Sequence, residues 1–543
     1  MEIGGRLAPA PPGELSGAVR VARDRTARHP ALRAALALIT AALGSGVLLA
    51  ASLPPWGWWP LALLGAAGLA LCLHGRSWSG RLLVGSAAGL GLYGPGLWWM
   101  TEFSAPGYVV TTILEAAIIG VATVAVAPGR GRGAAFPAAL LLASAFGGHW
   151  PFGGLPLAGI ALGQAGGPLA PAARLGGHLL LVFLVGVTGA ALAGVATAVR
   201  STSKPGLRRP EWRRVIGPVA ALAGVVAVGA AGVVAPTGSE RATLRVAAVQ
   251  GGGPRGLRAI DVGPQVPFEA HLAAAAGVTR PVDLLVFPEN VVSVGASLPG
   301  TEQEAKVADV ARSLGTTVVA GVVTDAGPEH FRNAAVAWAP DGRIVDGYVK
   351  VHRVPFGEYV PFRDLVSRVA DLSAVPRDAI AGRGPGVLTT PAGRLGVMIS
   401  FEVFFADRAR AAVRAGAEVL LVPTNASSYT TSQVPTQELA AARLRALETG
   451  RDVVQAAPTG FSAVVDFRGR VLRRSRLGPP AVEKATITRR EGQTLAVRLG
   501  DGPLVVAAGA ALALAWAVGA RPDWLRRTSR RVRPGPRTPG RRD

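Results

Sequence analysis

The chain has 543 residues, half of them hydrophobic, and a formal net charge of +23 at pH 7. This composition excludes an ordinary cytosolic enzyme and leaves room for one soluble domain beside a substantial membrane domain. The charge does not indicate nucleic-acid binding, because the arginines gather beside apolar stretches and in the tail 521–543, a pattern of membrane topology. A single cysteine, Cys72, excludes an intrachain disulfide and a cysteine-based metal cluster.

Several apolar runs approach the roughly 20 residues that span a bilayer. They lie near residues 33–52, 57–74, 82–97, 108–127, 134–148, 177–199, 215–235 and 503–520. The segment 150–176 is ambiguous, since its opening sequence Trp-Pro-Phe-Gly-Gly-Leu-Pro also fits a re-entrant or interfacial loop. We therefore expect a polytopic α-helical membrane domain with about eight spans.

Basic residues alternate along the connections between these runs. They occur near residues 76–81, 130–132 and 200–214, in the second, fourth and sixth connections, whereas the first and third connections have none and the fifth has only Arg174. Because cytoplasmic loops carry the excess of Lys and Arg, this pattern predicts cytoplasmic termini. The predicted organisation in a cell membrane is a basic cytoplasmic arm at 1–32, about seven spans within 33–235, an extracytoplasmic domain at 236–502, a last transmembrane helix at 503–520 and a basic cytoplasmic tail at 521–543.

Between the last two spans, short β-rich runs alternate with helical ones, which is typical of an α/β domain. Strands are predicted at residues 244–250, 282–287, 315–321, 394–400 and 417–422, a helix at 437–448 and a hairpin turn at 466–470.

Three polar residues are predicted to stand at strand ends in this domain. Glu289 ends the run Leu-Leu-Val-Phe-Pro-Glu, Lys350 precedes Val-His-Arg-Val-Pro-Phe-Gly-Glu358, and Ser400 ends Gly-Val-Met-Ile-Ser. Each one alone is more typical of a loop residue or a solvated charge. In this order and context they resemble the Glu-Lys-Cys triad of the nitrilase, or carbon–nitrogen hydrolase, superfamily.

Membrane spans on both sides of the domain narrow the resemblance to the apolipoprotein N-acyltransferases. The matching stretches begin at Phe287, Lys350, Ser400 and Ala440, and the resemblance covers nearly all of the chain except its two arms. It implies an α-β-β-α sandwich for the catalytic domain. It also implies a ping-pong reaction, in which an acyl chain passes from a membrane phospholipid through an acyl-enzyme to the α-amine of a diacylglyceryl-cysteine on a lipoprotein. No metal or cofactor and no nucleic-acid partner is expected.

The resemblance also implies roles for the matching residues. Glu289 would act as general base for the nucleophile, which is Ser400 in this chain. Lys350, with a backbone N–H just after residue 400, would stabilise the oxyanion on the acyl carbonyl. Glu358 would orient the lysine or the incoming amine, and Phe401 and Glu402 would be supporting residues.

The sequence departs from the family pattern at the nucleophile. A serine hydroxyl needs a well-placed base, whereas a cysteine thiol is intrinsically a strong nucleophile, and an acyl-serine is less reactive towards an amine than a thioester. Phe401 stands where the family more often has Tyr or Trp, and Thr424-Asn425 opens a loop that replaces the family's Asn-Asp-Ala-Trp type. Two functions remain open: an acyltransferase with a slow or specialised serine, and a non-catalytic homologue that binds lipoproteins or assists another acyltransferase. The sequence alone does not say whether Ser400 is natural or is a substitution made to stall the enzyme.

Overall fold

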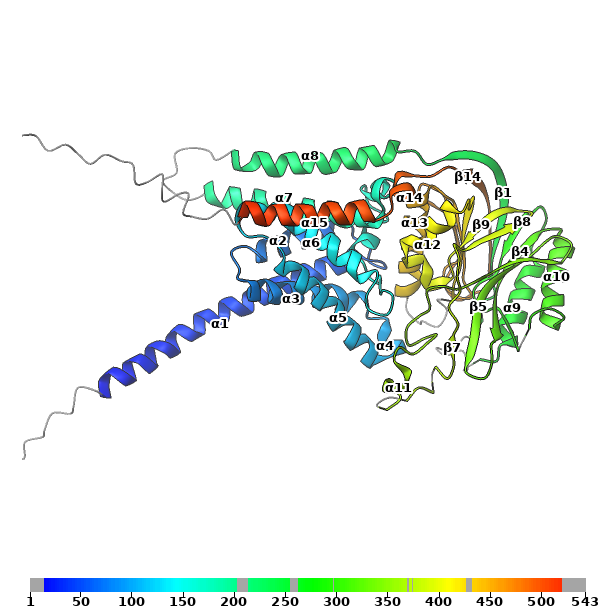
Figure 1. Ribbon diagram of the computed structural model, residues 1–543, viewed down its shortest axis with the longest axis horizontal. Coiled ribbons are helices and arrows are strands. Elements are labelled where there is room, and N and C mark those ends of the chain that lie inside the picture. The colour runs from blue at the N-terminus through cyan, green and yellow to red at the C-terminus, as the bar shows by residue number, and fades with distance from the viewer. Residues whose placement is uncertain are drawn as a thin grey trace, which may run out of the picture.

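The computed structural model consists of a helix bundle and an α/β domain that lie end to end (Figure 1). It describes residues 14–202, 213–253, 262–295, 297–368, 371–373, 375–425 and 432–519. The predicted tail at 521–543, residues 1–13 of the predicted arm and most of the loop that follows Asn425 lie outside the described residues.

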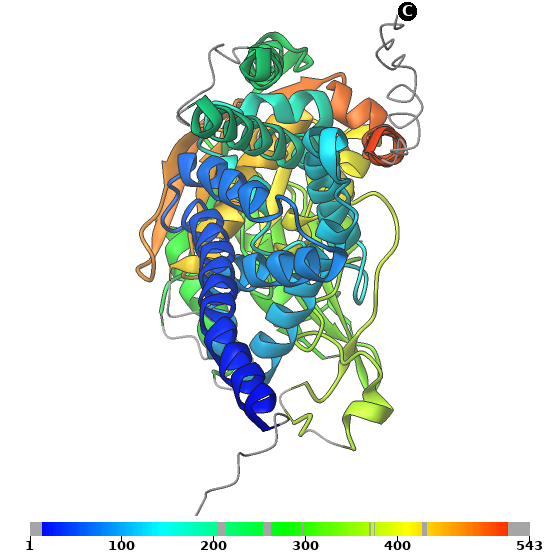
Figure 2. The same ribbon diagram turned by 90° about the vertical axis from the view of Figure 1, so that its left-hand side faces the viewer.

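Each predicted apolar run overlaps one helix of the bundle, which Figure 2 shows end-on. These helices are α1 (Glu14–Ala51), α2 (Pro60–Cys72), α3 (Trp78–Gly96), α5 (Ala105–Val124), α6 (Arg132–Gly147), α7 (Ala173–Thr202), α8 (Arg213–Val234) and α15 (Gly502–Gly519). Within the described part of the chain, five of them, α1, α5, α7, α8 and α15, are long and apolar enough to cross a membrane. The helices α2 and α6 are apolar but shorter.

Small residues let the helices of the bundle approach closely. A Cβ atom on Gly46 of α1 would lie 1.9 Å from the Ala88 carbonyl oxygen of α3, and one on Gly91 of α3 would lie 2.2 Å from the Leu43 carbonyl oxygen of α1. Glycine at both places permits backbone-to-backbone packing, which is how membrane helices commonly associate.

Short elements connect these helices. They are α4 (Met100–Phe103), η1 (Gly129–Gly131), η2 (Ile160–Gln164) and η3 (Ala170–Ala172). Residues 150–172, most of the ambiguous segment, form turns and the two short helices η2 and η3, and they are largely buried. Both η2 and η3 contact α13 of the α/β domain, so this segment lies at the junction of the two parts.

The α/β domain contains two sheets. The first has the order β14-β1-β2-β4-β5-β6, with β3 beside β4 and β7 beside β5. Its strands are β1 (Ser239–Gln250), β2 (Leu284–Val286), β3 (Val292–Val294), β4 (Thr317–Asp325), β5 (His330–Trp338), β6 (Ile344–Val349), β7 (Asp378–Ala379) and β14 (Ala481–Glu491). The second sheet has the order β13-β12-β11-β10-β9-β8. Its strands are β8 (Val387–Thr390), β9 (Gly393–Val397), β10 (Val419–Pro423), β11 (Val453–Ala456), β12 (Ala463–Val465) and β13 (Val471–Arg474).

The two sheets pack face to face between two layers of helices. The helices of this domain are α9 (Gln265–Ala276), α10 (Glu302–Leu314), α11 (Arg363–Val366), η4 (Ser400–Phe404), α12 (Ala406–Arg414), α13 (Gln433–Thr449) and α14 (Leu495–Leu499). Strands β1, β2 and β4 pair in parallel, as do β9, β10 and β11, and both triplets are apolar because parallel strands are covered on both faces. One core lies between the sheets, a second lies under α9 and α10, and a third lies under α12 and α13. The predicted α-β-β-α sandwich is confirmed.

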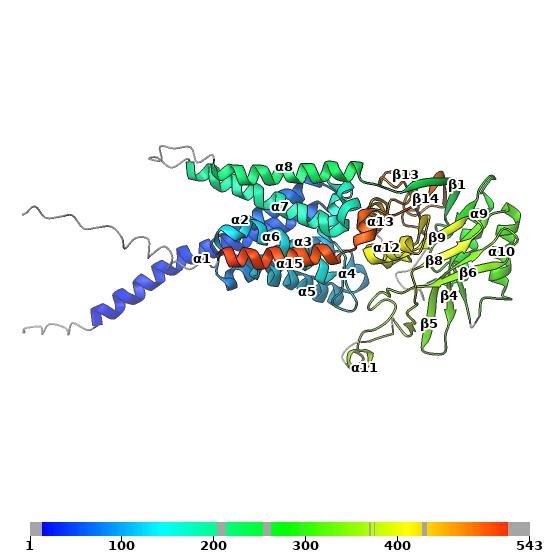
Figure 3. The same ribbon diagram turned by 45° about the horizontal axis from the view of Figure 1, so that its top comes forward.

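The layer formed by α12 and α13 faces the helix bundle (Figure 3). Its core continues without interruption into the core of the membrane helices. The Gln433 side chain donates to the Pro95 carbonyl oxygen at 2.8 Å, and Gln437 donates to the Gly96 carbonyl oxygen at 3.0 Å. These bonds attach α13 to the end of α3.

The predicted elements of the α/β domain are found in the structure with one correction. The runs at 244–250, 282–287, 315–321 and 417–422 contain β1, β2, β4 and β10, the helix at 437–448 lies within α13, and the turn at 466–470 joins β12 to β13. The predicted strand 394–400 is too long, since β9 ends at Val397. Ser400 adopts a φ of +47°, in the left-handed region, and begins the helix η4 instead.

Candidate active site

Three of the predicted residues meet at one buried ion-pair cluster. Glu289 follows β2, Lys350 follows β6, and Glu358 lies in the loop after Lys350. The Lys350 Nζ atom donates to Glu289 Oε1 at 2.9 Å and to Glu358 Oε1 at 2.9 Å. Only 2% of the Lys350 side chain is exposed, so the ammonium depends on these two carboxylates for compensation.

Asn333 of β5 completes this cluster and was missed by the sequence reasoning. Its Nδ2 atom donates to Glu289 Oε1 at 2.8 Å and to Glu358 Oε1 at 2.9 Å. The backbone carbonyl oxygen of Asn333 accepts the backbone N–H of Lys350 at 2.9 Å, which fixes the lysine backbone beside β5. The sequence does contain one signal for Asn333, which is a polar residue directly before the apolar run that ends β5. Such a residue is buried with the strand and then needs a hydrogen-bond partner.

The protonation states in this cluster follow from burial and charge. Burial works against the ammonium of Lys350, but the carboxylates of Glu289 and Glu358 raise its pKa above the ordinary value. Burial raises the pKa of Glu289, and the Lys350 ammonium opposes that rise. Lys350 is therefore a fixed cation at neutral pH, which can donate hydrogen bonds to an oxyanion.

Glu402 connects the segment around Ser400 to the segment around Lys350. Its Oε1 atom accepts hydrogen bonds from the Tyr348 hydroxyl at 2.8 Å, the Val351 N–H at 2.8 Å and the His352 N–H at 3.1 Å. Its Oε2 atom accepts the Ile399 N–H at 2.8 Å. Glu402 is completely buried, and these contacts make it a positioning residue between the strand before Ser400 and the loop after Lys350.

Ser400 begins η4 and presents its hydroxyl to two other polar groups. Its Oγ atom lies 3.3 Å from Glu438 Oε1 and 3.2 Å from Thr424 Oγ1. The next residue, Phe401, packs its ring on that of Phe405 with centroids 5.0 Å apart. The backbone N–H of Phe401 belongs to the first turn of η4, where N–H groups have no intrahelical acceptor. That N–H can serve an oxyanion bound beside Ser400.

Glu438 of α13 is the second residue that the sequence reasoning missed. Thr424 Oγ1 lies 2.7 and 2.8 Å from its two carboxylate oxygens. Burial raises the pKa of Glu438 to about 7, the Thr424 hydrogen bond acts against this rise, and the charge of Glu289 adds to it. No pattern in the sequence marks Glu438, because α13 is buried on nearly every face and has no exposed polar face from which a buried carboxylate would stand out.

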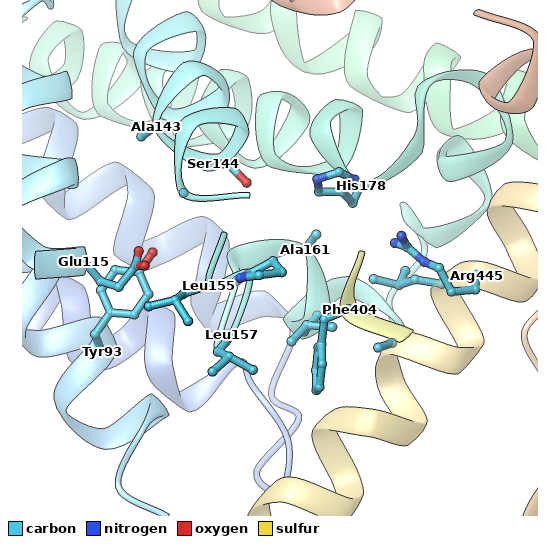
Figure 4. Close-up of a pocket in the computed structure, with 16 residues that line it drawn as sticks. Tyr93, Glu115, Ala143, Ser144, Leu155, Leu157, Ala161, His178, Phe404 and Arg445 are labelled. Atoms are coloured by element: carbon cyan, nitrogen blue, oxygen red, sulfur yellow. The ribbon is translucent and has the colours of Figure 1, made fainter. Parts of the chain in front are cut away.

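A small cavity of about 50 Å³ lies on the membrane side of η4 (Figure 4). Phe404 of η4 and Arg445 of α13 line it from the α/β domain, and Tyr93, Glu115 and His178 line it from the bundle. The segment that carries Ser400 therefore rests directly on the membrane helices.

Comparison with known proteins agrees with the fold. Residues 245–496 match the carbon–nitrogen hydrolase family, and this match with the α-β-β-α sandwich defines the class of the α/β domain. Residues 45–191 match the apolipoprotein N-acyltransferase N-terminal domain. The chain belongs to the apolipoprotein N-acyltransferase family, the membrane-bound branch of the hydrolase superfamily.

Similar proteins match most of the chain. The apolipoprotein N-acyltransferase of Photobacterium profundum is 29% identical over 496 residues, which are 85% of this chain and 91% of that protein. The apolipoprotein N-acyltransferase of Mycolicibacterium smegmatis is 29% identical over 90% of this chain and 87% of its own length. Among solved structures, an amidase from Nesterenkonia sp. is 22% identical with a TM-score of 0.35, and the match covers 50% of this chain and 98% of that chain.

Proposed function

We propose that this protein transfers an acyl chain from a membrane phospholipid to the α-amine of a diacylglyceryl-cysteine of a lipoprotein, through an acyl-enzyme on Ser400. The observation that carries the proposal is the buried Lys350 ammonium between Glu289 and Glu358, in a hydrolase fold that is attached to membrane helices. Such a buried cluster is not expected to contribute much to stability, so we assign it a role in the reaction, the stabilisation of an oxyanion.

In the first half-reaction, the Ser400 Oγ atom attacks the carbonyl carbon of a phospholipid ester. The oxyanion that forms is stabilised by the Lys350 ammonium and the Phe401 N–H. The serine proton goes to a carboxylate of the site, which is Glu289 by the family resemblance or Glu438 by contact with the hydroxyl. The bond to the glycerol oxygen then breaks, and a lysophospholipid leaves with that proton.

In the second half-reaction, the α-amine of the lipoprotein attacks the acyl-serine ester. The same oxyanion groups stabilise the second tetrahedral intermediate, and Ser400 leaves as the hydroxyl. Glu358 keeps the ammonium of Lys350 in position through both steps, since its Oε1 atom accepts a hydrogen bond from Lys350 Nζ at 2.9 Å. Asn333 holds that carboxylate by donating to the same oxygen at 2.9 Å. The product is an amide, which is more stable than either ester, so the overall transfer is favourable.

The distribution of charge supports an extracytoplasmic α/β domain. The helices α3, α7 and α15 each have one end at the α/β domain, and their other ends lie at the far end of the bundle (Figure 1). The far end carries the basic connections, with Arg76, Arg81, Arg132, Arg200 and Arg213. Since cytoplasmic loops are rich in Lys and Arg, the far end fits the cytoplasmic side and the α/β domain fits the outer side. Both termini would then be cytoplasmic.

Exposed aromatic side chains at the junction support access from the lipid. Trp58, Trp98 and Trp150 are exposed near the α/β end of the bundle, and such residues favour the membrane–water interface. Phe362, which is 76% exposed, packs one ring edge on Phe152 of the bundle with centroids 6.4 Å apart. Substrates that are anchored in the bilayer can therefore reach the site by lateral diffusion.

The alternative, a non-catalytic lipoprotein-binding homologue, is not favoured. A site released from catalysis does not need a buried lysine between two carboxylates, because replacing such groups by apolar ones is often neutral or stabilising.

The proposal is tested with the purified full-length protein in nanodiscs that contain phospholipid with an isotope-labelled acyl chain, together with a diacylglyceryl peptide. Intact-mass spectrometry is expected to show an acyl mass on Ser400 and triacylated peptide. Glu329→Gln, which changes an exposed carboxylate away from the site, serves as the control and is expected to match the wild type. Neither product from the wild type, with both appearing in Ser400→Cys, would support the non-catalytic alternative. Neither product from either protein would overturn the proposal.

A further inference from the structure

We propose that Glu438 is a catalytic residue of this enzyme, whose carboxylate accepts the hydroxyl proton of Ser400 when the serine attacks. The inference rests on the proposed acyl transfer and assigns the nucleophile a base that the family resemblance does not include. In this arrangement Glu289 holds the Lys350 ammonium, and the Glu438 carboxylate of α13 accepts and returns the serine proton.

The hydrogen bonds around the two carboxylates separate their roles. Among the described residues, the Ser400 hydroxyl has hydrogen-bond contacts with Glu438 and Thr424. The side-chain contacts of Glu289 in the same part of the chain are those to Lys350 and Asn333. The distance of 3.3 Å from Ser400 Oγ to Glu438 Oε1 is long for a hydroxyl donor, but catalytic hydrogen bonds often tighten only when substrate is bound.

Thr424 fixes the carboxylate of Glu438 towards the nucleophile. Its hydroxyl lies 2.7 and 2.8 Å from the two carboxylate oxygens, and it lies 3.2 Å from Ser400 Oγ. The three side chains come from η4, from the residue after β10 and from α13, so three separate elements converge on the hydroxyl. This is the arrangement of a nucleophile with an oriented base.

The charge environment suits Glu438 to proton transfer near neutral pH. The charged groups that face it are Glu289, from the segment after β2, and Lys350, from the segment after β6. Burial and the charge of Glu289 raise the pKa of Glu438 to about 7, whereas Thr424, Ser400 and Lys350 act in the opposite direction. A general base is most effective when its pKa lies near the operating pH.

The Glu438 carboxylate accounts for every proton transfer in the two steps. In the first step, the bond from Ser400 Oγ to the acyl carbon forms and the hydroxyl proton moves to Glu438. Collapse of the intermediate breaks the bond to the glycerol oxygen, which takes the proton from Glu438. In the second step, the neutral α-amine attacks and gives a proton to Glu438, which passes it to Ser400 Oγ as the ester bond breaks. No oxidant, reductant or water is consumed.

The identity of the nucleophile provides the decisive comparison. A serine depends on its base, whereas a thiol reacts with less help because part of it is already ionised. We expect Glu438→Gln to slow acyl-enzyme formation on Ser400 by about 10²–10⁴-fold, the usual contribution of a general base. In the Ser400→Cys background the same substitution is expected to cost about tenfold or less. Equal losses in both backgrounds would assign Glu438 a structural role and overturn the proposal.

A second measurement removes the dependence on lipid substrates. The probe is an alkyl fluorophosphonate, which forms a bond from Ser400 Oγ to phosphorus and releases fluoride, with the serine proton passing to the base. In the wild type and in the Glu329→Gln control, the labelling rate is expected to rise with pH through about 7, because Glu438 must be ionised to accept the proton. Glu438→Gln is expected to lose this rise. Glu289→Gln is expected to keep a rise that is shifted to lower pH, because the charge of Glu289 raises the pKa of Glu438.

The outcomes distinguish this proposal from the proposed function. Glu438-dependent labelling without transfer from phospholipid would support the base and overturn the acyltransferase function. Transfer from phospholipid that Glu438→Gln leaves unchanged would support the function and overturn the base. A wild-type protein that is neither labelled nor acylated would overturn both. The activity retained by Ser400→Cys/Glu438→Gln shows that the substituted protein is folded.

Discussion

Replacement of Lys350 by methionine tests the buried ion-pair cluster most directly. Methionine has a similar length but no charge, so the substitution removes the ammonium that lies 2.9 Å from both Glu289 and Glu358. The two carboxylates, which share the Asn333 amide, would then face each other in a buried site. One of them must take up a proton, because two adjacent buried carboxylates cannot both stay ionised.

The magnitude follows from this geometry. Removing one partner of a buried ion pair costs about 3–5 kcal/mol. A loss of 1 kcal/mol lowers the melting temperature of a domain of 150–250 residues by about 2–4 °C, so we expect a decrease of about 6–20 °C. Loss of the oxyanion contact should separately slow acyl-enzyme formation by at least about 10²-fold.

The double variant Lys350→Met/Glu358→Gln separates stability from catalysis. The second substitution removes the excess negative charge beside Glu289, so it is expected to recover a substantial part of the lost melting temperature and none of the lost rate. Thermal unfolding in detergent and acylation followed by mass spectrometry measure the two effects. An unchanged melting temperature in Lys350→Met, or a double variant that is no more stable than the single one, would refute the account of the buried charges. A rate within threefold of the wild type would refute the oxyanion role.

Three further predictions concern other groups of the site. Glu438 has a pKa of about 7 in the folded protein, above its ordinary value, so its neutral form stabilises the fold at low pH and this contribution is lost as pH rises through about 7. At pH 8, Glu438→Gln should therefore have a free energy of unfolding about 3 kcal/mol greater than that of the wild type and should unfold at a higher temperature. At pH 4.5 the two proteins should unfold at similar temperatures. Ser400→Cys should raise the yield of triacylated peptide at least about tenfold, measured in single-turnover reactions, because the thioester reacts faster with an amine. Glu402→Gln should destabilise the protein by about 1–3 kcal/mol in thermal unfolding, because an amide cannot accept all the hydrogen bonds that the carboxylate accepts, whereas Glu329→Gln should not.

The sequence predicted that Glu289, Lys350 and Glu358 share one site, because they stand in recognisable local contexts and in this order resemble a known triad. Glu289 and Lys350 each follow a buried run, and Glu358 lies in a loop with the Pro-Phe-Gly-Glu pattern. A charged residue directly after a buried strand must either reach solvent or find a buried partner, and here the three residues find each other. The roles of these residues remain predictions.

The parts that were missed or wrong depend on contacts between distant segments. Asn333 and Glu438 are brought to the site by β5 and α13. The signal at Asn333 is one polar residue before an apolar strand end, which does not say what the residue contacts, and no local pattern marks Glu438. The end of β9 was placed too late because Gly-Val-Met-Ile-Ser reads as a continuous strand, whereas Glu402 accepts the Ile399 N–H and the chain turns at Ser400. The apolar runs were located correctly, but α2, α3 and α6 are short or glycine-rich, and hydropathy alone does not fix their depth in a membrane.

The helix α13 links the candidate active site to the membrane helices. The helix carries Glu438 towards Ser400, and it is covered by the second sheet on one side and by the bundle on the other. Arg410 of α12 contacts both Glu448 at the end of α13 and Asp501 at the start of α15, at 2.9 and 2.8 Å. An α/β domain released from its helices would expose the apolar and charged surface of this layer and lose the contacts that hold α13 in place. We therefore expect the geometry at Ser400 to depend on the bundle, which supports the candidate active site as well as anchoring the domain.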